Sequence, residues 1–321
     1  MTEWIECTLD KLGEIVGGAT PSTKCEDYYG GSIPWITPKD LSSFKGRYIT
    51  SGERNITEKG LASCSAQMMP KDAVLFTSRA PIGYVAIASQ SVCTNQGFKS
   101  IVVNDKADPL FVYYLLKYNK DAIEAMGSGT TFKEVSGKTM RAVKVRIPLD
   151  VSYQKRIAAV LDSLDTKIEN NERINDNLLA QAQTLYKQFF PYGVQDDLPD
   201  GWRIGTVGEI IEIHDSKRIP LSGADRSKME KKIYPYYGAA SLMDLVDNYI
   251  FDGKYLLLGE DGTVVDDAGY PILQYVWGQF WVNNHAHILT GRLGYDVESL
   301  YMLFKQTPVK SIVTGAVQPK I

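Results

Sequence analysis

The sequence predicts a mixed α/β (α+β) protein, with two tandem homologous globular domains separated by one long coiled-coil-type helix. Three observations predict this class. Residues 152–190 contain no glycine or proline and carry apolar side chains at heptad spacing. Short strings before that segment recur in the same order after it, and both flanks alternate strand-like runs with turn residues. We therefore expect a first domain over 1–150, a spacer helix over 151–192 and a second domain over 193–321.

The first half is expected to form short strands joined by Gly- and Pro-rich turns, with a few helices. The runs DAVLFTSRAPIGYVAI (72–87) and SVCTNQGFKSIVV (91–103) are rich in strand-forming residues. Asp108 followed by Pro109 predicts the start of a helix, because an aspartate caps the first turn and proline suits its first position. The body of this helix is expected to end before Gly127.

Ser152 to Phe190 is expected to form one helix, capped by Ser152 and ended by Pro191 and Gly193. At 1.5 Å per residue it would be roughly 58 Å long. One face carries a heptad seam with two central asparagines, and such a seam packs against another helix. Its positions are Ile157, Leu161, Leu164, Ile168, Asn171, Asn175, Leu178, Ala182, Leu185 and Phe189. We expect a spacer or docking helix rather than an ordinary core helix.

Residues after the helix repeat the first half weakly but in unbroken order, which predicts a duplication. WIECTLDKLGEI pairs with WRIGTVGEI, IPWITPKDL with IYPYYGAASL, DAVLFTSRAPIGYVAI with GKYLLLGEDGTVVDDAG, and SVCTNQGFKSIVV with QFWVNNHAHILTG. Asp296 opens a second helix as Asp108 does, and GSGTTFKE (127–134) matches TGAVQPKI (314–321). Counterparts of VSGKTMRAVKVRIP and of the long helix are missing, so we expect the second domain to be incomplete at its C-terminal end.

Enzyme motifs are absent from the sequence. The string SGKT does not complete a phosphate-binding loop, because Phe132 stands where that loop needs its first glycine. There is no glycine-rich dinucleotide loop and no Asn-Pro-Pro-Tyr string. His285 and His287 alternate on an expected strand, but two ring nitrogens do not close a zinc site. We therefore expect a non-catalytic chain that holds neither a metal nor a cofactor of its own.

Bulk composition favours a cytoplasmic globular protein. The chain is 44% apolar and 23% charged, begins without a secretory signal, and lacks the roughly 18 uninterrupted apolar residues of a membrane span. The four cysteines, Cys7, Cys25, Cys64 and Cys93, form no CxxC pair. We expect them to be reduced thiols.

Charge is distributed unevenly along the chain. Residues 1–150 carry 18 Lys and Arg against 16 Asp and Glu, whereas residues 191–321 carry 12 against 17. A protein that held DNA only by neutralising phosphates would be far more basic. DNA binding by this chain would therefore depend on base contacts or on a partner that supplies positive charge.

Two such halves around a long helix resemble the DNA-specificity (S) subunits of type I restriction–modification systems. The resemblance rests on the segments IPWITPKDL, FTSRAPIGYVAI and VCTNQGF, on GSGTTFKEV with its copy TGAVQPKI, and on the helix start QKRIAAVLDSLDTKIE. It implies that each half is a target-recognition domain that reads one part of a split double-stranded DNA sequence, with the long helix as a ruler. It also implies that methyltransferase subunits, which hold S-adenosylmethionine, dock on the helices, and that a further restriction subunit cuts.

The chain departs from this family where the second long helix is missing. In relatives that helix packs antiparallel to the first, so the stripe from Ile157 to Phe189 is expected to have no partner within the chain. Either the sequence is truncated, or a second specificity chain supplies the helix. Two alternatives stay open: a shortened specificity chain that dimerises or regulates assembly without full DNA recognition, and an enzyme with an unrecognised site.

Candidate DNA contacts follow from side-chain chemistry alone, because Arg, Lys, Asn and Gln suit base edges and hydroxyls suit phosphates. In the first half they are Lys39, Thr77, Ser78, Arg79, Asn95, Gln96, Lys99, Ser128, Thr130, Thr131 and Lys133. In the second half they are Lys217, Arg218, Tyr236, Tyr237, Asn283, Asn284, His285, Gln318 and Lys320. Arg79 is the preferred candidate, because it stands in a turn between two strand-like runs, beside Pro81 and Gly83.

Overall fold

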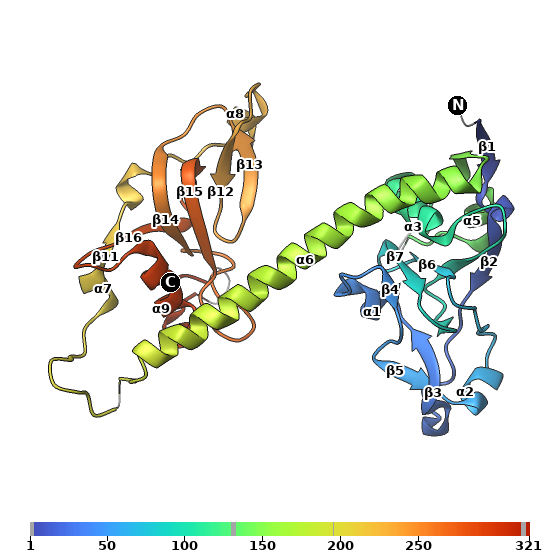
Figure 1. The fold of residues 1–321 in the computed structure, drawn as a ribbon, viewed down its shortest axis with the longest axis horizontal. Helices are drawn as coiled ribbons and strands as arrows, with labels where there is room; N and C mark the ends of the chain where they lie inside the picture. The colour runs from blue at the N-terminus through green and yellow to red at the C-terminus, as the bar shows by residue number, and fades with distance from the viewer. Residues whose placement is uncertain (1–2, 130–132, 195, 316–318) are drawn as a thin grey trace. The chain divides into compact units, whose positions relative to one another are not determined.

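The computed structural model describes residues 3–129, 133–194, 196–315 and 319–321 (Figure 1). The chain divides into two compact units, Met1–Arg173 and Ile174–Ile321, and the division falls inside the longest helix. We call these unit 1 and unit 2. The chain is thus mixed α/β with two β-sheet units joined by a long helix, as the repeats and the heptad pattern predicted.

The described part of unit 1 holds three β-sheets. The largest has the strand order β2–β9–β6–β7–β4, with bounds β2 Gly13–Gly17, β4 Tyr48–Ile49, β6 Val74–Ser78, β7 Ile82–Ala88 and β9 Lys99–Val103. A second sheet has the order β5–β3–β8, with bounds β3 Tyr29–Ile36, β5 Arg54–Ile56 and β8 Cys93–Thr94. The third pairs β1 (Trp4–Thr8) antiparallel with β10 (Lys144–Pro148). This last pair joins the beginning of the chain to the residues just before the long helix.

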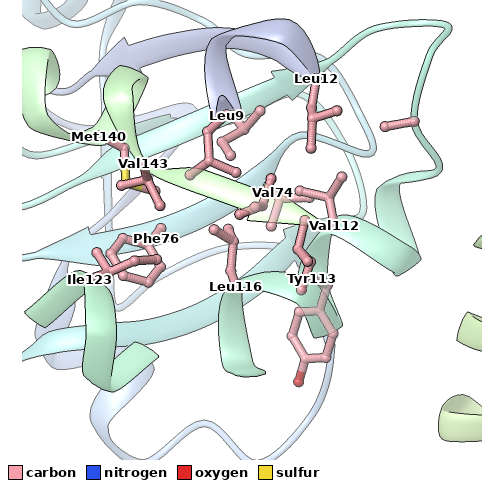
Figure 2. Close-up of a cluster of buried hydrophobic side chains, with 14 of the residues drawn as sticks. Leu9, Leu12, Val74, Phe76, Val112, Tyr113, Leu116, Ile123, Met140 and Val143 are labelled. Atoms are coloured by element: carbon pink, nitrogen blue, oxygen red, sulfur yellow. The ribbon is translucent and has the colours of Figure 1, made fainter. Parts of the chain in front are cut away.

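Both faces of the five-stranded sheet are buried, because successive side chains of a strand point to opposite faces. Val74 and Phe76 belong to a core shared with Val112 and Leu116 (Figure 2). Leu75, between them, packs in a second core on the other face. The helices of the unit are α1 Pro38–Ser42, α2 Glu58–Ala62, α3 Pro109–Tyr118, α4 Lys120–Ala125 and α5 Gly137–Ala142.

The helix predicted from Pro109 to Met126 is two helices, α3 and α4, separated at Asn119. Asp108 caps α3 as predicted, and its carboxylate accepts from the Phe111 N–H at 3.0 Å. The break arises because the Asn119 side chain turns back and donates to the Leu115 carbonyl at 2.8 Å, which ends the regular helix there.

The long helix, α6, runs without interruption from Val151 to Phe189. Its cap is Asp150 rather than the predicted Ser152, since the Asp150 carboxylate accepts from the Ser152 N–H at 2.8 Å. Among the described residues no helix, α6 included, is both long and apolar enough to cross a lipid bilayer.

The first turns of α6 belong to the packing of unit 1. Gln154 and Ala158 are buried, and Ile157 packs against the core that contains Phe76. The expectation that the seam is unpartnered from Ile157 onward is therefore wrong at Ile157. Farther along, the seam residues Leu164, Ile168, Leu178, Leu185 and Phe189 are exposed, at 55%, 56%, 56%, 54% and 71%.

The described residues of unit 2 contain one six-stranded sheet with the order β11–β16–β14–β15–β12–β13. Its strands are β11 Ile211–Ile213, β12 Tyr234–Tyr237, β13 Leu242–Val246, β14 Phe251–Gly259, β15 Leu273–Val282 and β16 Ala286–Gly291. The helices are α7 Val207–Ile210, α8 Gly223–Ser227 and α9 Val297–Phe304. Leu257 and Ile288 pack in a core on one face, while Leu256 and Leu289 pack with α9 on the other.

Candidate functional site

A turn after β6 in unit 1 is held by backbone hydrogen bonds from two distant segments. The Ser78 N–H donates to the Gly97 carbonyl at 2.7 Å, and the Ser78 carbonyl accepts from the Val135 N–H at 2.9 Å. Ser128 and Glu134 exchange two backbone hydrogen bonds, at 3.0 and 2.9 Å. We call the three segments joined by these bonds the turn frame.

Unit 2 contains the same turn frame after β14. The Glu260 N–H donates to the His285 carbonyl at 2.9 Å, and the Glu260 carbonyl accepts from the Ile321 N–H at 3.1 Å. Thr314 and Lys320 exchange two backbone hydrogen bonds, at 3.0 and 2.8 Å. Each bond of unit 1 thus has a counterpart in unit 2.

An asparagine shapes the middle segment of both frames. The Asn95 side-chain oxygen accepts from the Gly97 N–H at 2.8 Å, and the Asn283 side-chain oxygen accepts from the His285 N–H at 2.8 Å. This turn, in which the side chain bonds the backbone two residues on, fixes the position of the residues that follow the asparagine.

These bonds define equivalent positions in the two units. The equivalent pairs are Ser78 and Glu260, Arg79 and Asp261, Gly97 and His285, Lys99 and His287, and Glu134 and Lys320. Ser128 is equivalent to Thr314, whereas the sequence match paired Gly127 with Thr314. The predicted repeat is therefore present with a shift of one residue there, because strand pairing and not residue similarity sets the register.

The frame of unit 1 carries more positive than negative charge. Arg79 Nη1 lies 3.5 Å from one Glu134 carboxylate oxygen, and Lys99 Nζ lies 3.5 Å from the other. The side chain of Arg79 is 34% exposed, that of Lys99 17% and that of Glu134 38%. Two cations thus share one carboxylate at a surface that solvent reaches.

The frame of unit 2 has the opposite balance. His285 Nδ1 is hydrogen-bonded to Asp261, and His287 Nδ1 lies 2.6 Å from an oxygen of Asp215. Glu260 adds a further carboxylate, 3.8 Å from His287 Nδ1. Sequence reasoning missed Asp215, Glu260 and Asp261, because it searched only for side chains that donate to DNA.

Arg218 supplies the counter-charge inside this acidic group. Its guanidinium pairs with Glu260, lies 3.3 Å from Asp215 and donates to the Ala286 carbonyl at 3.0 Å. Asp215, Glu260 and His287 place metal-ligand-type atoms within 4.8 Å of one another, and Arg218 contacts both carboxylates of that group. The Arg218 side chain, a predicted DNA contact, is 14% exposed and engaged within its own unit.

Four further candidates are buried. They are Thr77, Ser78, Tyr236 and Asn283, which are 0%, 0%, 1% and 4% exposed. Thr77 closes the turn, since its hydroxyl accepts from the Tyr84 N–H at 2.8 Å and donates to the Pro81 carbonyl at 2.8 Å. The Tyr236 hydroxyl accepts from the Leu221 N–H at 3.0 Å. Their polarity satisfies buried backbone groups, which is the alternative role of polar residues next to strands.

The remaining candidates lie at or near the surface. Lys39, Gln96, Ser128, Lys133, Lys217, Asn284 and Lys320 are exposed, and Arg79, Asn95, Lys99, Tyr237 and His285 are half-buried. Thr130, Thr131 and Gln318 lie outside the described residues. Lys39 lies 2.8 Å from Glu53, whose hydrogen bond raises the pKa of the lysine. The frames bring together Arg79, Asn95, Gln96, Lys99 and Ser128 in unit 1, and Asn283, Asn284, His285 and Lys320 in unit 2.

The SGKT string begins a short helix. Ser136 caps α5, and its hydroxyl accepts from the Thr139 N–H at 3.0 Å. The polar side chain is therefore used to begin a short helix directly after the frame residue Val135.

The chain has two β-sheet units that share the turn frame and are joined by one continuous helix. It is therefore a protein with a duplicated domain. The model of the family "Type I restriction modification DNA specificity domain" matches residues 1–180 and 199–321, and this chain belongs to that family.

The chain is also similar to individual members. It is 39% identical over 233 residues to the type I restriction enzyme MjaIX specificity subunit of Methanocaldococcus jannaschii, which covers 68% of this chain and 54% of the relative. It is 28% identical over 193 residues to the EcoR124I/EcoR124II specificity subunit of Escherichia coli, covering 58% of this chain and 46% of the relative. The chain spans about half the length of these curated relatives.

A solved structure shares the fold. The S subunit of a type I restriction–modification system from M. genitalium superposes with a TM-score of 0.59 at 17% identity, over 97% of this chain and 78% of that one. At this identity the likeness concerns the fold alone.

Proposed function

We propose that this chain is the non-catalytic, DNA-reading subunit of a type I restriction–modification complex, in which each unit reads one part of a split double-stranded target. The observation that carries the proposal is the turn frame, which occurs twice with the same hydrogen bonds and different charged side chains. Two readers of different half-sites need this combination, since the backbone positions the side chains and the side chains select the bases.

Unit 1 would read its half-site mainly with donors. Arg79 and Lys99 match the O6 and N7 acceptors that guanine shows in the major groove, and an arginine fork can engage both at once. Glu134 contacts both cations and orients them before DNA arrives. The partial exposure of Arg79 leaves its guanidinium accessible to a base edge.

Unit 2 would read a different half-site, because its frame offers acceptors where unit 1 offers donors. Asp261, which is 12% exposed and hydrogen-bonded to His285, stands at the position of Arg79, and a carboxylate suits the amino group of cytosine. His285 stands at the position of Gly97 and adds a ring that is both donor and acceptor. Lys320, which is exposed, replaces Glu134 and supports a phosphate or guanine contact.

Charge argues that the chain binds DNA within a complex. The net charge of −3 provides little of the phosphate neutralisation on which DNA affinity depends. We assign that task to methyltransferase subunits, which would hold S-adenosylmethionine and dock on the exposed stripe of α6, with a restriction subunit joining them in the cytoplasm. Leu164, Ile168 and Leu178 are each more than half exposed, as expected for a docking surface.

The same stripe supports a second candidate function, assembly control. A chain that occupies methyltransferase subunits, or pairs with a second specificity chain through this stripe, would regulate the complex without delivering it to a full target. The acidic frame of unit 2 favours this reading, because it repels DNA phosphates unless a base contact compensates.

Selection from random-sequence duplex DNA tests the proposal. The chain is purified alone and with methyltransferase subunits of a type I system, and bound DNA is sequenced. Enrichment of a two-part motif with a constant gap supports the reading function. A stable protein complex that enriches no motif would replace it by assembly control, and methyl transfer by the chain alone would overturn the non-catalytic role.

A further inference from the structure

Arg47 of unit 1 lies against three carboxylates of α6. Its Nε is 3.0 Å from Asp162, Nη2 is 3.2 Å from Glu169 and Nη1 is 3.9 Å from Asp165. Nη2 also donates to the Thr166 hydroxyl at 2.9 Å. The Arg47 side chain is only 10% exposed, so these contacts are shielded from solvent far more than an ordinary surface ion pair. One planar guanidinium thus engages two turns of the helix.

Helix α3 adds a second attachment at the same place. The Tyr114 hydroxyl donates to the Asp165 carboxylate at 3.0 Å, and Lys117 Nζ lies 3.8 Å from it. The Arg47 backbone carbonyl accepts from the Ile87 N–H at 2.7 Å, which ties the arginine to the central sheet. The group formed by Arg47, Tyr114, Lys117 and their partners on α6 is called the carboxylate clamp below.

The apolar and amide contacts of α6 with unit 1 cover a much shorter stretch. Gln154 accepts from the Asp108 N–H at 3.0 Å and donates to the Pro148 carbonyl at 2.9 Å, and Ala158 is buried. The buried residues of α6 are Gln154 and Ala158, both in its first turns. With the clamp, the attachment extends to Glu169.

The length of the attachment decides how well the direction of the helix is fixed. At 1.5 Å per residue the short attachment is about 6 Å long and the full one about 22 Å. Ordered atoms move by about 1 Å. A displacement of this size at the attachment moves the end of α6 by about 9 Å if the attachment is short, and by about 2 Å if it is full. One turn of B-DNA is about 34–36 Å for 10–10.5 base pairs, so one base pair rises about 3.4 Å. Only the full attachment keeps the displacement of the helix end below this rise.

We propose that Arg47 is a positioning residue that fixes the direction in which α6 leaves unit 1, and thereby sets the gap length between the two half-sites. This inference rests on the proposed function. It assigns the selection of the gap to a side chain that does not itself touch DNA.

A distance measurement in the chain alone tests the mechanical part. Spin labels on genetically encoded residues at Lys59 and Lys187 report the distribution of distances between unit 1 and the end of α6. We expect Arg47→Met to broaden this distribution about two- to fourfold, by the lever estimate above, and Arg47→Lys to have a smaller effect. Lys144→Met, which removes an exposed ion pair with Glu6 elsewhere in unit 1, is the matched control and should not change the width.

A second measurement tests the consequence for DNA. Duplexes with the selected half-sites and gaps one base pair shorter or longer are compared in binding to the complete complex. Wild type should lose about tenfold or more on a one-base-pair change, as for a mismatched site, whereas Arg47→Met should discriminate about twofold or less. Each half-site preference should stay the same, which a general loss of folding would not produce.

Glu169→Gln is a second test in case the Arg47 variant misfolds. It removes only the outermost ion pair of the clamp, at a side chain that is 37% exposed. It should shift gap selectivity in the same direction. An unchanged distance width with Arg47→Met and Glu169→Gln would overturn the clamp whether or not the chain binds DNA. Broadened distances without any two-part motif for wild type would instead overturn the proposed function and with it the gap-setting role.

Discussion

Arg79 and Asp261 occupy equivalent positions in two turn frames that share the same backbone hydrogen bonds. In unit 1 the arginine lies 3.5 Å from Glu134, and in unit 2 the aspartate is hydrogen-bonded to His285. The charge at this position is therefore reversed between the two units.

Arg79→Ala should weaken or relax recognition of one half-site only. A bidentate arginine–base pair contributes about 1–3 kcal/mol of discrimination, so specificity at one base pair should fall by that amount. Selection from random DNA with the complete complex measures it. Lys144→Ala removes an exposed cation from the same unit and serves as the control. Unchanged affinity and specificity would remove Arg79 from the interface.

Asp261→Asn should alter the other half-site and leave the first unaffected. The amide replaces one carboxylate acceptor by a donor, so a preference for a base-pair edge that offers an amino group should be lost. Glu212→Gln changes an exposed carboxylate of the same unit outside the frame and is the control. If the Asp261 variant alters both halves equally, the side chain acts on the whole complex and not on one reader.

Stability of unit 2 should decline in acid through Glu298. Hydrogen bonds from Lys254 at 2.6 Å and from Tyr275 at 2.7 Å lower the pKa of Glu298 from 4.5 to about 2. Because the folded-state pKa is depressed, the contribution is present above pH 4.5 and is lost as the pH falls toward 2.

The Glu298 side chain is 46% exposed, so solvent screening keeps the contribution below about 1 kcal/mol. Glu298→Gln should therefore be slightly less stable than wild type at neutral pH, and the difference should vanish near pH 2. Denaturant unfolding at several pH values measures it. A constant difference across the range would show that the ion pair is not its source.

Replacing Leu164, Ile168 and Leu178 by serine should abolish docking on α6 without unfolding either unit. These side chains are more than half exposed, so their loss costs the isolated chain little burial. Sedimentation of the chain with and without methyltransferase subunits measures docking. Val160→Ser removes an apolar side chain that is 62% exposed and lies outside the heptad positions, and should leave docking unchanged. Full assembly of the triple variant would exclude the stripe as a docking surface.

Features that depend on neighbouring residues could be predicted from the sequence. The absence of Gly and Pro and the heptad spacing predicted α6 to within one residue at either end, because helix formation depends on local hydrogen bonds and side-chain periodicity. Asp108 and Asp296 cap their helices as expected, at 3.0 and 2.7 Å. The order of the repeated strings predicted two related β-sheet units.

Features that depend on burial, or on contacts between residues far apart in the sequence, could not be predicted from the sequence. Thr77, Tyr236 and Asn283 have side chains that suit DNA contacts, yet the sheets bury them, and residue chemistry alone gives no measure of burial. Ile157 follows the heptad pattern like its neighbours, but the core of unit 1 covers it. Arg47 and Glu169 are separated by 122 positions in the chain, so nothing in the local pattern pairs them.

The sequence by itself therefore determined the duplicated plan, the long helix and the chemical types available for recognition, since each follows from short-range order along the chain. Only the tertiary structure decided which of those side chains reach solvent, which opposite charges meet, and where the helix is fastened. The physical reason is that burial and ion pairing are properties of surfaces brought together by folding, and their energies depend on solvent exclusion that no single segment creates.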